Sequence, residues 1–323
     1  MKRKNLLLIL SFILTLLIAV GCNKTQKPND IKFYYPNGVP ALTVAKLAKE
    51  NPGISEDITI DYEMQESPDI LVSKIMKGEA DIAIVPSNLA AQAFNKSIPY
   101  KLVGTSVWGS FYITSTEDIK NFKDLKGREI YSIGRGLTPD IVLQYILSNN
   151  GLDPNENVEI NYLNAESELG PAFIGGKTNL AVLPEPLATN IMMEKGNAKV
   201  IFNLNEEWKD ITGNANGYPQ ASLIIKQDLL ENNRDFIEKF LKEYKKSQEW
   251  ALENPERLGD YANDLEISIK KETIIEGQNR MNINFVETKD CKKEYEIFFK
   301  VILDFAPEFI GNKLPNEEFY FER

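Results

Sequence analysis

The chain has 323 residues, 43% hydrophobic and 26% charged, which is enough for one large or two medium globular domains. Its formal net charge of −10 argues against nucleic acid as a partner, because phosphate binding needs a basic surface. The chain contains no histidine, which excludes Ser-His-Asp and Cys-His nucleophiles, imidazole acid–base catalysis and His-ligated zinc. We therefore expect a protein that is not an enzyme and uses neither cofactor nor metal.

The amino terminus has the pattern of an export signal. Three basic residues after Met1 precede an apolar run, Leu6–Val20, that is too short to cross a bilayer comfortably. The run ends in AVGC at Cys22, which resembles the lipobox of bacterial lipoproteins, although Leu is usual where Ala19 stands. The resemblance implies a signal peptide over 1–21 and lipidation of Cys22. A polar tether would then reach residue 30, with the protein on the outer face of the bacterial cytoplasmic membrane.

An internal repeat organises the first half of the chain. Three segments recur in the same order, roughly 98 to 100 residues later. Several residues match within each pair, and three ordered matches at a nearly constant offset indicate a structural duplication. The paired segments are Ile31–Leu47 with Glu129–Tyr145, Ile60–Ser67 with Ile160–Ser167, and Gly78–Ala90 with Gly176–Ala188.

Each repeat predicts strand, Gly-containing turn, helix, strand, turn, helix and strand. The sequence SPD at 67–69 is typical of a helix start, and Gly78 of a left-handed helix end. The third strands, IAIV and LAVL, are continuously apolar, as expected for strands covered on both faces. The alternation predicts an α/β protein with two doubly wound lobes. The first repeat should contain Ile31–Tyr35, Pro40–Glu50, Ile58–Met64, Pro68–Lys77 and Ile82–Val85.

The carboxyl-terminal third does not match the repeat. Apolar residues at helical spacing predict helices over Asp228–Glu253, stopped by Pro255, and over Lys292–Phe305. We interpret both as cover for the first lobe, since aromatic stripes at this spacing usually face a core. With Cys22 lipidated, Cys291 has no partner for an intramolecular disulfide.

Ligands of open α/β sheets bind beyond the carboxyl ends of the strands, where the matched loops of both repeats lie. If the lobes face each other, these loops converge on one cleft. Aromatic residues in or beside the connections between lobes are candidates to stack on a planar ligand. The predicted contacts are Asn37, Gly38, Val39, Pro40, Glu66, Ser67, Ser87 and Asn88 from the first repeat, Gly134, Arg135, Gly136, Leu137, Thr138 and Glu185 from the second, and Trp108 and Tyr218 from the connections. Glu166 and Phe111 lie in the same loops and connections but are not among the predicted contacts.

The order of lipobox, GEADIAIVPSN, DLKGREI, Gly-rich turn and LAVLPEP resembles the nitrate/sulfonate/taurine-type substrate-binding proteins, the NMT1/THI5-like family. That superfamily includes binders of thiamine pyrimidine precursors. The resemblance implies a type II periplasmic-binding-protein fold whose two lobes, 31–108 with 220–323 and 112–216, are joined by a two-strand hinge at Ser106–Ile113 and Asn216–Leu223. It also implies closure on a small-molecule ligand, docking on an ABC permease with a cytoplasmic ATPase, and a monomer.

The cues to ligand charge conflict. Free amides in the Gly-rich turn before Thr138, together with Arg135, would suit an anion. Glu185, held between two prolines, would suit an amine or a ring N–H. We predict a small nitrogen-containing organic nutrient, with a sulfonate or nitrate-like anion as the alternative. Other classes left open are a lipid-anchored sensor or adhesin, and a hydrolase that uses Glu66, Glu166 or Glu185.

Overall fold

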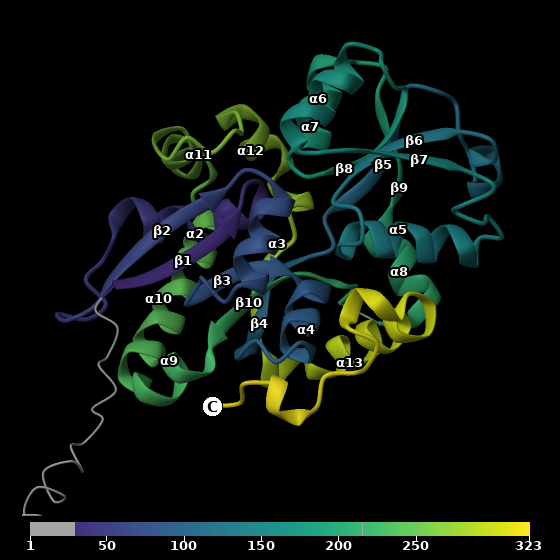
Figure 1. Ribbon diagram of the computed structural model, residues 1–323. Helices are drawn as coiled ribbons and strands as arrows, with labels where there is room; N and C mark the ends of the chain where they lie inside the picture. The colour runs from purple at the N-terminus through teal and green to yellow at the C-terminus, as the bar shows by residue number, and fades with distance from the viewer. Residues whose placement is uncertain (1–29, 215) are drawn as a thin grey trace, which may run out of the picture.

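A computed structural model describes residues 30–214 and 216–323, so the expected signal peptide, Cys22 and the tether lie outside the described residues. The strands form two sheets, which define lobe one and lobe two (Figure 1). Within the described ranges, no helix is both long and apolar enough to span a bilayer. The six strands of lobe one are β1 (Asp30–Pro36), β2 (Thr59–Gln65), β3 (Ile82–Pro86), β4 (Tyr100–Trp108), β10 (Pro219–Lys226) and β11 (Ile283–Glu287). The five of lobe two are β5 (Phe111–Ser115), β6 (Glu129–Ile133), β7 (Glu159–Leu163), β8 (Leu180–Pro184) and β9 (Lys199–Asn203).

The two sheets repeat one strand order. Lobe one reads β2-β1-β3-β10-β4 with β11 on its edge, and lobe two reads β7-β6-β8-β5-β9. The first three strands of each lobe are parallel, and β10 and β5 are antiparallel to their neighbours. The predicted fold of two doubly wound lobes is confirmed, and the sequence repeat matches β1–β3 with β6–β8.

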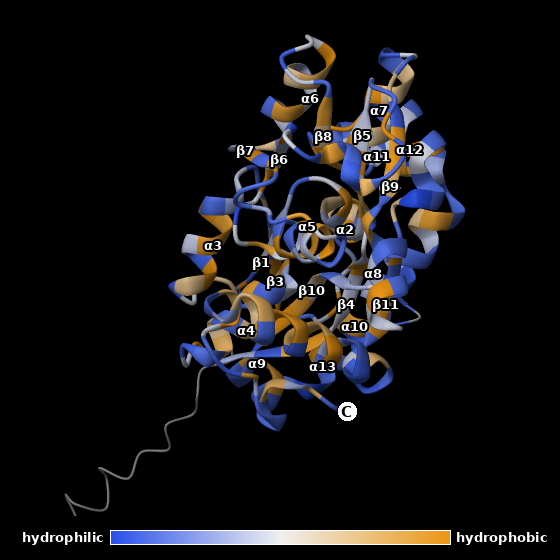
Figure 2. Cartoon of the chain, turned by 90° about the vertical axis from the view of Figure 1, so that its right-hand side faces the viewer, coloured by the Kyte–Doolittle hydropathy of each residue, from blue (hydrophilic) through white to orange (hydrophobic). Residues whose placement is uncertain are grey.

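Helices cover both sheets and direct their apolar sides inward (Figure 2). The central parallel strands β3 and β8 are consequently buried on both faces along almost their whole length. Lobe one carries α2 (Val39–Glu50), α3 (Pro68–Met76), α4 (Ser87–Asn95), α9 (Gln227–Asn232), α10 (Arg234–Glu253), α11 (Pro255–Asp264), α12 (Lys271–Gly277) and α13 (Thr288–Phe305). Lobe two carries α5 (Thr138–Asn149), α6 (Glu166–Ile174), α7 (Leu187–Glu194) and α8 (Leu204–Thr212).

The predicted helix boundaries hold in the first repeat and shift elsewhere. Helix α3 begins at Pro68 after an extended Ser67, and Gly78 beyond its end has a φ of 68°. The predicted helix 228–253 is two helices, because Asn233 interrupts it with φ −130° and ψ 42°. Helix α13 starts at Thr288, earlier than predicted, and is kinked at Cys291.

The two connections between the lobes lie against each other. Gly109 N donates to Tyr218 O at 3.1 Å, and Asn205 Oδ1 accepts from Tyr218 N at 3.1 Å. A Cβ added at Gly109 would lie 2.4 Å from Asn205 Oδ1, and one at Gly217 would lie 1.9 Å from it. The Asn205 side chain thus packs against Gly109 of the first connection and Gly217 of the second, and no side chain fits at either glycine.

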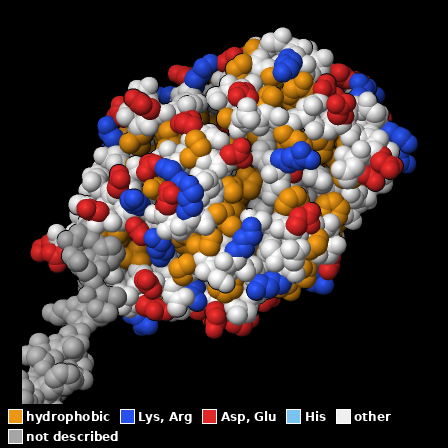
Figure 3. Space-filling model, in the orientation of Figure 1, with side chains coloured by type: hydrophobic (Ala, Val, Ile, Leu, Met, Phe, Trp, Pro, Cys, Tyr) orange, Lys and Arg blue, Asp and Glu red, His pale blue; other side chains and the backbone are white. Residues whose placement is uncertain are grey.

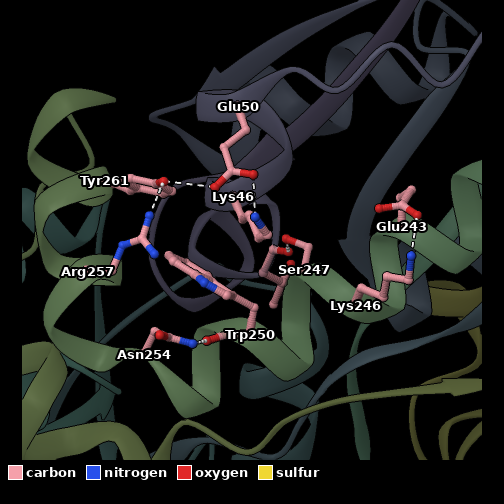
Figure 4. A network of polar contacts seen from close by, with 10 residues as sticks. Lys46, Glu50, Glu243, Lys246, Ser247, Trp250, Asn254, Arg257 and Tyr261 are labelled. Carbon is pink, nitrogen blue, oxygen red and sulfur yellow. Dashed lines mark hydrogen bonds and ion pairs between the residues drawn. The ribbon is translucent and has the colours of Figure 1, made fainter.

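A surface network fastens the carboxyl-terminal helices to the outside of lobe one (Figure 4). Trp250 of α10 stacks on Tyr261 of α11 with ring centroids 5.1 Å apart, and the Arg257 guanidinium lies 5.4 Å from the Trp250 ring centroid. Tyr261 OH donates to Glu50 of α2 at 2.8 Å, and Lys46 forms an ion pair with the same carboxylate. Helix α11 is thereby tied to α2.

A chain of buried hydroxyls runs through the core of lobe one. Ser87 Oγ lies 2.6 Å from Ser222 Oγ, which lies 2.7 Å from Tyr295 OH. Thr105 Oγ1 donates to the same Tyr295 oxygen at 2.9 Å. All four side chains are buried, so Tyr295 satisfies two hydroxyls that have no access to water.

Replacing Tyr295 with Phe should lower the free energy of unfolding by about 1–3 kcal/mol, because Ser222 and Thr105 lose a buried partner. Urea unfolding measures the change, and the denaturant slope should stay constant. Tyr131→Phe is the control, since its hydroxyl makes no hydrogen bond within the described part of the chain. Equal stability of Tyr295→Phe and wild type would contradict the role of the hydroxyl chain.

Candidate ligand-binding site

Two adjoining cavities lie where the lobes meet, with volumes of about 410 and 100 Å³. We call them together the cleft. They are bordered by the carboxyl ends of β1, β2 and β3 from lobe one and of β6 and β8 from lobe two. Both cavities are lined by Pro36, Asn37, Pro68, Ile133 and Glu166.

Two carboxylates from equivalent positions of the repeat line the cleft. Asn37 Nδ2 donates to Glu66 Oε2 at 2.9 Å, while Asn37 Oδ1 accepts from Gly38 N at 2.8 Å, so Asn37 orients Glu66. Glu166, at the first position of α6, reaches lobe one. Its Oε1 lies 3.0 Å from where a Cβ on Gly38 would be, and Gly38 has a φ of 90°. A side chain at Gly38 would therefore displace the Glu166 carboxyl.

Glu166 has no hydrogen-bond or ion-pair partner among the described residues. Burial, followed by the nearby charge of Glu66, raises the pKa of Glu166 to about 8. The carboxyl is consequently neutral near pH 7 unless a positive group enters the cleft.

The remaining charges of the cleft are paired. Lys270 is the basic side chain that lines it within the described ranges, and Lys270 forms an ion pair with Glu194. The fully buried Glu185 accepts from Arg280 Nε at 2.6 Å and from Thr189 N at 3.3 Å. Glu66 and Glu166 are left without a cation in the described part of the chain, so the cleft carries uncompensated acidity.

The smaller cavity is largely apolar. Leu71 and Val72 of α3 line it from lobe one, and Phe111, Leu137 and Pro139 line it from lobe two. The cleft thus combines an acidic, polar part with an apolar recess, which suits a small organic molecule better than a bare inorganic ion.

Several predicted contacts lie at the cleft. Gly38 lies beside Glu166, as described above. Glu185 reaches the apolar recess, although Arg280 already holds its carboxylate. The predicted residues that line the cavities are Asn37, Val39, Pro40, Glu66, Gly134, Leu137 and Glu185, and Phe111 and Glu166 line them in addition.

Other predicted contacts lie elsewhere. Ser87 belongs to the buried hydroxyl chain, and Ser67 precedes α3 without lining either cavity. Trp108 donates from Nε1 to Asn284 O at 3.2 Å beside the hinge. Tyr218 is fully buried and packs edge-on against Trp208, with ring centroids 6.0 Å apart. Neither of the predicted aromatic contacts, Trp108 and Tyr218, lines the cleft.

The Gly-rich turn does not form the expected anion site. Gly136 N donates to the buried Asp140 at 2.7 Å, and Leu137 N donates to Gly134 O at 2.9 Å, so these amides are already bonded. Arg135 points to a separate groove, where its guanidinium lies 5.4 Å from the Tyr162 ring centroid. A carboxylate of the protein itself occupies the place that an external anion would take.

Sequence reasoning missed one wall of the cleft. The segment 268–273, at and before α12, lines the larger cavity together with Gln65 and Asn190. It lies in the third of the chain that has no counterpart in the repeat, so no signal in the sequence marked it. Gln220, two residues after Tyr218 in the second connection, lines the recess and was also missed.

Comparisons with known proteins identify the family and the fold. A family model described as "NMT1/THI5 like" matches residues 55–258. "Putative binding protein YtlA" from Bacillus subtilis (strain 168) is 25% identical over 278 residues, which cover 81% of this chain and 80% of that protein. The crystal structure of an ABC transporter from Parabacteroides distasonis has a TM-score of 0.75 at 25% identity, covering 92% of this chain and 100% of that one. The periplasmic aliphatic sulphonate binding protein SsuA from Escherichia coli shares the fold, with a TM-score of 0.72 at 15% identity over 91% of this chain and 92% of that one.

The pKa of Glu166 predicts how stability depends on pH. A carboxyl whose pKa is raised in the folded state holds its proton where the unfolded chain has lost it, so stability falls as pH rises from about 4.5 to 8. Glu166→Gln removes this loss. The variant should melt at a higher temperature than wild type at pH 8, with the gain shrinking toward pH 5.

Thermal melts of the ligand-free protein between pH 5 and pH 8 test this prediction. The matched control is Glu249→Gln, at an exposed carboxyl of α10 far from the cleft. A gain for Glu166→Gln that is the same at both pH values would contradict the raised pKa.

Proposed function

The chain belongs to the NMT1/THI5-like family, and we propose that it is the solute-binding component of an ABC importer that captures a small nitrogen-containing organic nutrient in its cleft. The proposed ligand carries a protonated nitrogen. One observation carries this choice: Glu66 and Glu166 line the cleft from opposite lobes and have no cationic partner in the described residues.

A protonated nitrogen suits this pair of carboxylates in both charge and geometry. A cation between them would favour the ionised form of Glu166 and supply N–H donors to oxygens from both lobes. Because the contact needs both lobes, the ligand would favour the closed arrangement over an open one. The apolar recess beside Phe111 would take the hydrocarbon or ring portion of the same molecule.

An anionic ligand is the alternative, because the sulphonate binding protein SsuA has the same fold. The charges of this cleft oppose it. Two like charges about 4 Å apart repel by about 4 kcal/mol at the effective dielectric constant of a protein surface. A sulfonate beside Glu66 would meet that repulsion, while the exposed Arg135 lies outside the cleft.

The setting of the protein is part of the proposal. An exported chain, anchored through lipid on Cys22 and acting as a monomer beside a permease with a cytoplasmic ATPase, suits capture of a solute outside the cell. Lysine, arginine, aspartate and glutamate side chains are interspersed on the visible face, as is usual for a soluble domain (Figure 3).

The ligand class is tested by native mass spectrometry of the purified protein, followed by titration of the recovered molecule. Thermal-shift panels of primary amines, cationic heterocycles, alkanesulfonates and nitrate give an independent reading. We expect a compound with a protonated nitrogen to bind, and Glu66→Gln to weaken it about 10- to 100-fold through loss of a charge-assisted hydrogen bond.

Arg135→Ala is the matched control, because this charge lies outside the cleft and the variant should bind as wild type does. A ligand that is a sulfonate or nitrate, or an affinity that falls in Arg135→Ala and not in Glu66→Gln, would overturn the proposed ligand class.

A further inference from the structure

The lobes also touch directly through two residues that line neither cavity of the cleft. Asn88, at the start of α4 in lobe one, donates from Nδ2 to Gly136 O of lobe two at 2.9 Å. Thr138 Oγ1 of α5 donates to Asn88 Oδ1 at 3.0 Å, and Asn88 N lies 3.3 Å from the same hydroxyl. Both side chains are buried, at 2% and 0% exposure, and neither lines the cleft. Asn88 Nδ2 also donates to Phe309 O within lobe one at 3.2 Å, so the amide joins Gly136 and Thr138 of lobe two to its own lobe.

A structural repeat could in principle produce two equivalent contacts between the lobes, but the residues at the second position differ. By the alignment of the repeats, Asn88 corresponds to Pro186, and Thr138 corresponds to Pro40. The symmetry-related position therefore pairs two prolines, which cannot form the same hydrogen bonds. Pro40 and Pro186 line the cleft instead. At one of the two equivalent positions, Asn88 and Thr138 join the lobes. At the other, Pro40 and Pro186 border the space proposed for the ligand.

The far side of the cleft is also bridged by protein. Helices α7 of lobe two and α12 of lobe one lie side by side in both views (Figures 1 and 2). Lys270 pairs with Glu194 across this boundary, and Thr273 Oγ1 donates to Asn190 Oδ1 at 3.4 Å. The described residues thus hold the lobes together on two flanks of the cleft, with the unpaired Glu66 and Glu166 between them.

We propose that Asn88 and Thr138 form a ligand-independent latch that sets how often the empty protein is closed. Opening the lobes would exchange the latch hydrogen bonds for water, so the latch biases the equilibrium modestly without locking it. The apparent affinity for any ligand that needs the closed form then depends on the latch, because it scales with the closed fraction of the free protein. Asn88 and Thr138 are positioning residues, since they act on the lobes and not on the ligand.

The latch is tested by measuring the distance between the lobes in the ligand-free chain. Spin labels at Glu79→Cys in lobe one and Asn179→Cys in lobe two report this distance by pulsed electron resonance, with Cys22 replaced by Ala. The buried Cys291, at 1% exposure, should not be labelled. In Asn88→Ala we expect a closed-to-open ratio about 3- to 10-fold lower than in the labelled parent.

Asn95→Ala is the matched control. Asn95 lies on the same helix and donates from Nδ2 to Ile310 O at 2.6 Å and Lys313 O at 2.8 Å, both within lobe one. It should leave the distance distribution unchanged. Thr138→Val attacks the same contact from the other lobe and should shift the ratio in the same direction as Asn88→Ala, even if one of the two variants folds poorly.

The double variant Asn88→Ala/Thr138→Val should lower the ratio by less than the product of the single effects, as expected for residues in direct contact. Unchanged distances in both single variants, or shifts as large in Asn95→Ala, would overturn the latch. Because no ligand is added, this outcome would be independent of whether the proposed ligand class is right.

Discussion

A carboxylic acid without a partner in a closing cleft is costly to ionise, and Glu166 is placed so that a ligand can remove this cost. Its carboxyl lies against the backbone of Gly38 in the opposite lobe, and Glu66 adds a second negative charge beside it. Every other charge that lines the cleft in the described residues has an opposite charge at hand. Glu66 and Glu166 are therefore the acidic groups of the cleft that the proposed positive group on a ligand would pair with.

The strand order shared by the two lobes explains why a cleft forms between them. Residue differences at equivalent loop positions explain the shape of the cleft. The common strand order brings the same loops of both lobes to one mouth. Where lobe one has Asn88, lobe two has Pro186, and where lobe two has Thr138, lobe one has Pro40. The polar pair joins the lobes outside the cleft, whereas the proline pair lines the cleft. The retained pair, Glu66 and Glu166, also lines the cleft and supplies the acidity.

The sequence was sufficient to predict the fold, because the repeat, the apolar third strands and the SPD helix start are local signals. It also placed Glu66, Glu166 and Asn37 in loops at the carboxyl ends of strands. It could not show that Asp140 would take the amide of Gly136, or that Ser87 would turn into the core, since both depend on side-chain direction. The sequence could not predict that segment 268–273 lines the cleft, because only tertiary packing brings this segment there.

The central claim is most directly tested by counting protons when the recovered nitrogen-containing ligand binds. Calorimetric titration at pH 7 in buffers of different ionisation enthalpy gives this number. A cation that forces Glu166 to ionise should release about one proton per ligand, and the release should vanish in Glu166→Gln. A binding enthalpy that is the same in all buffers, or proton uptake in place of release, would contradict the account.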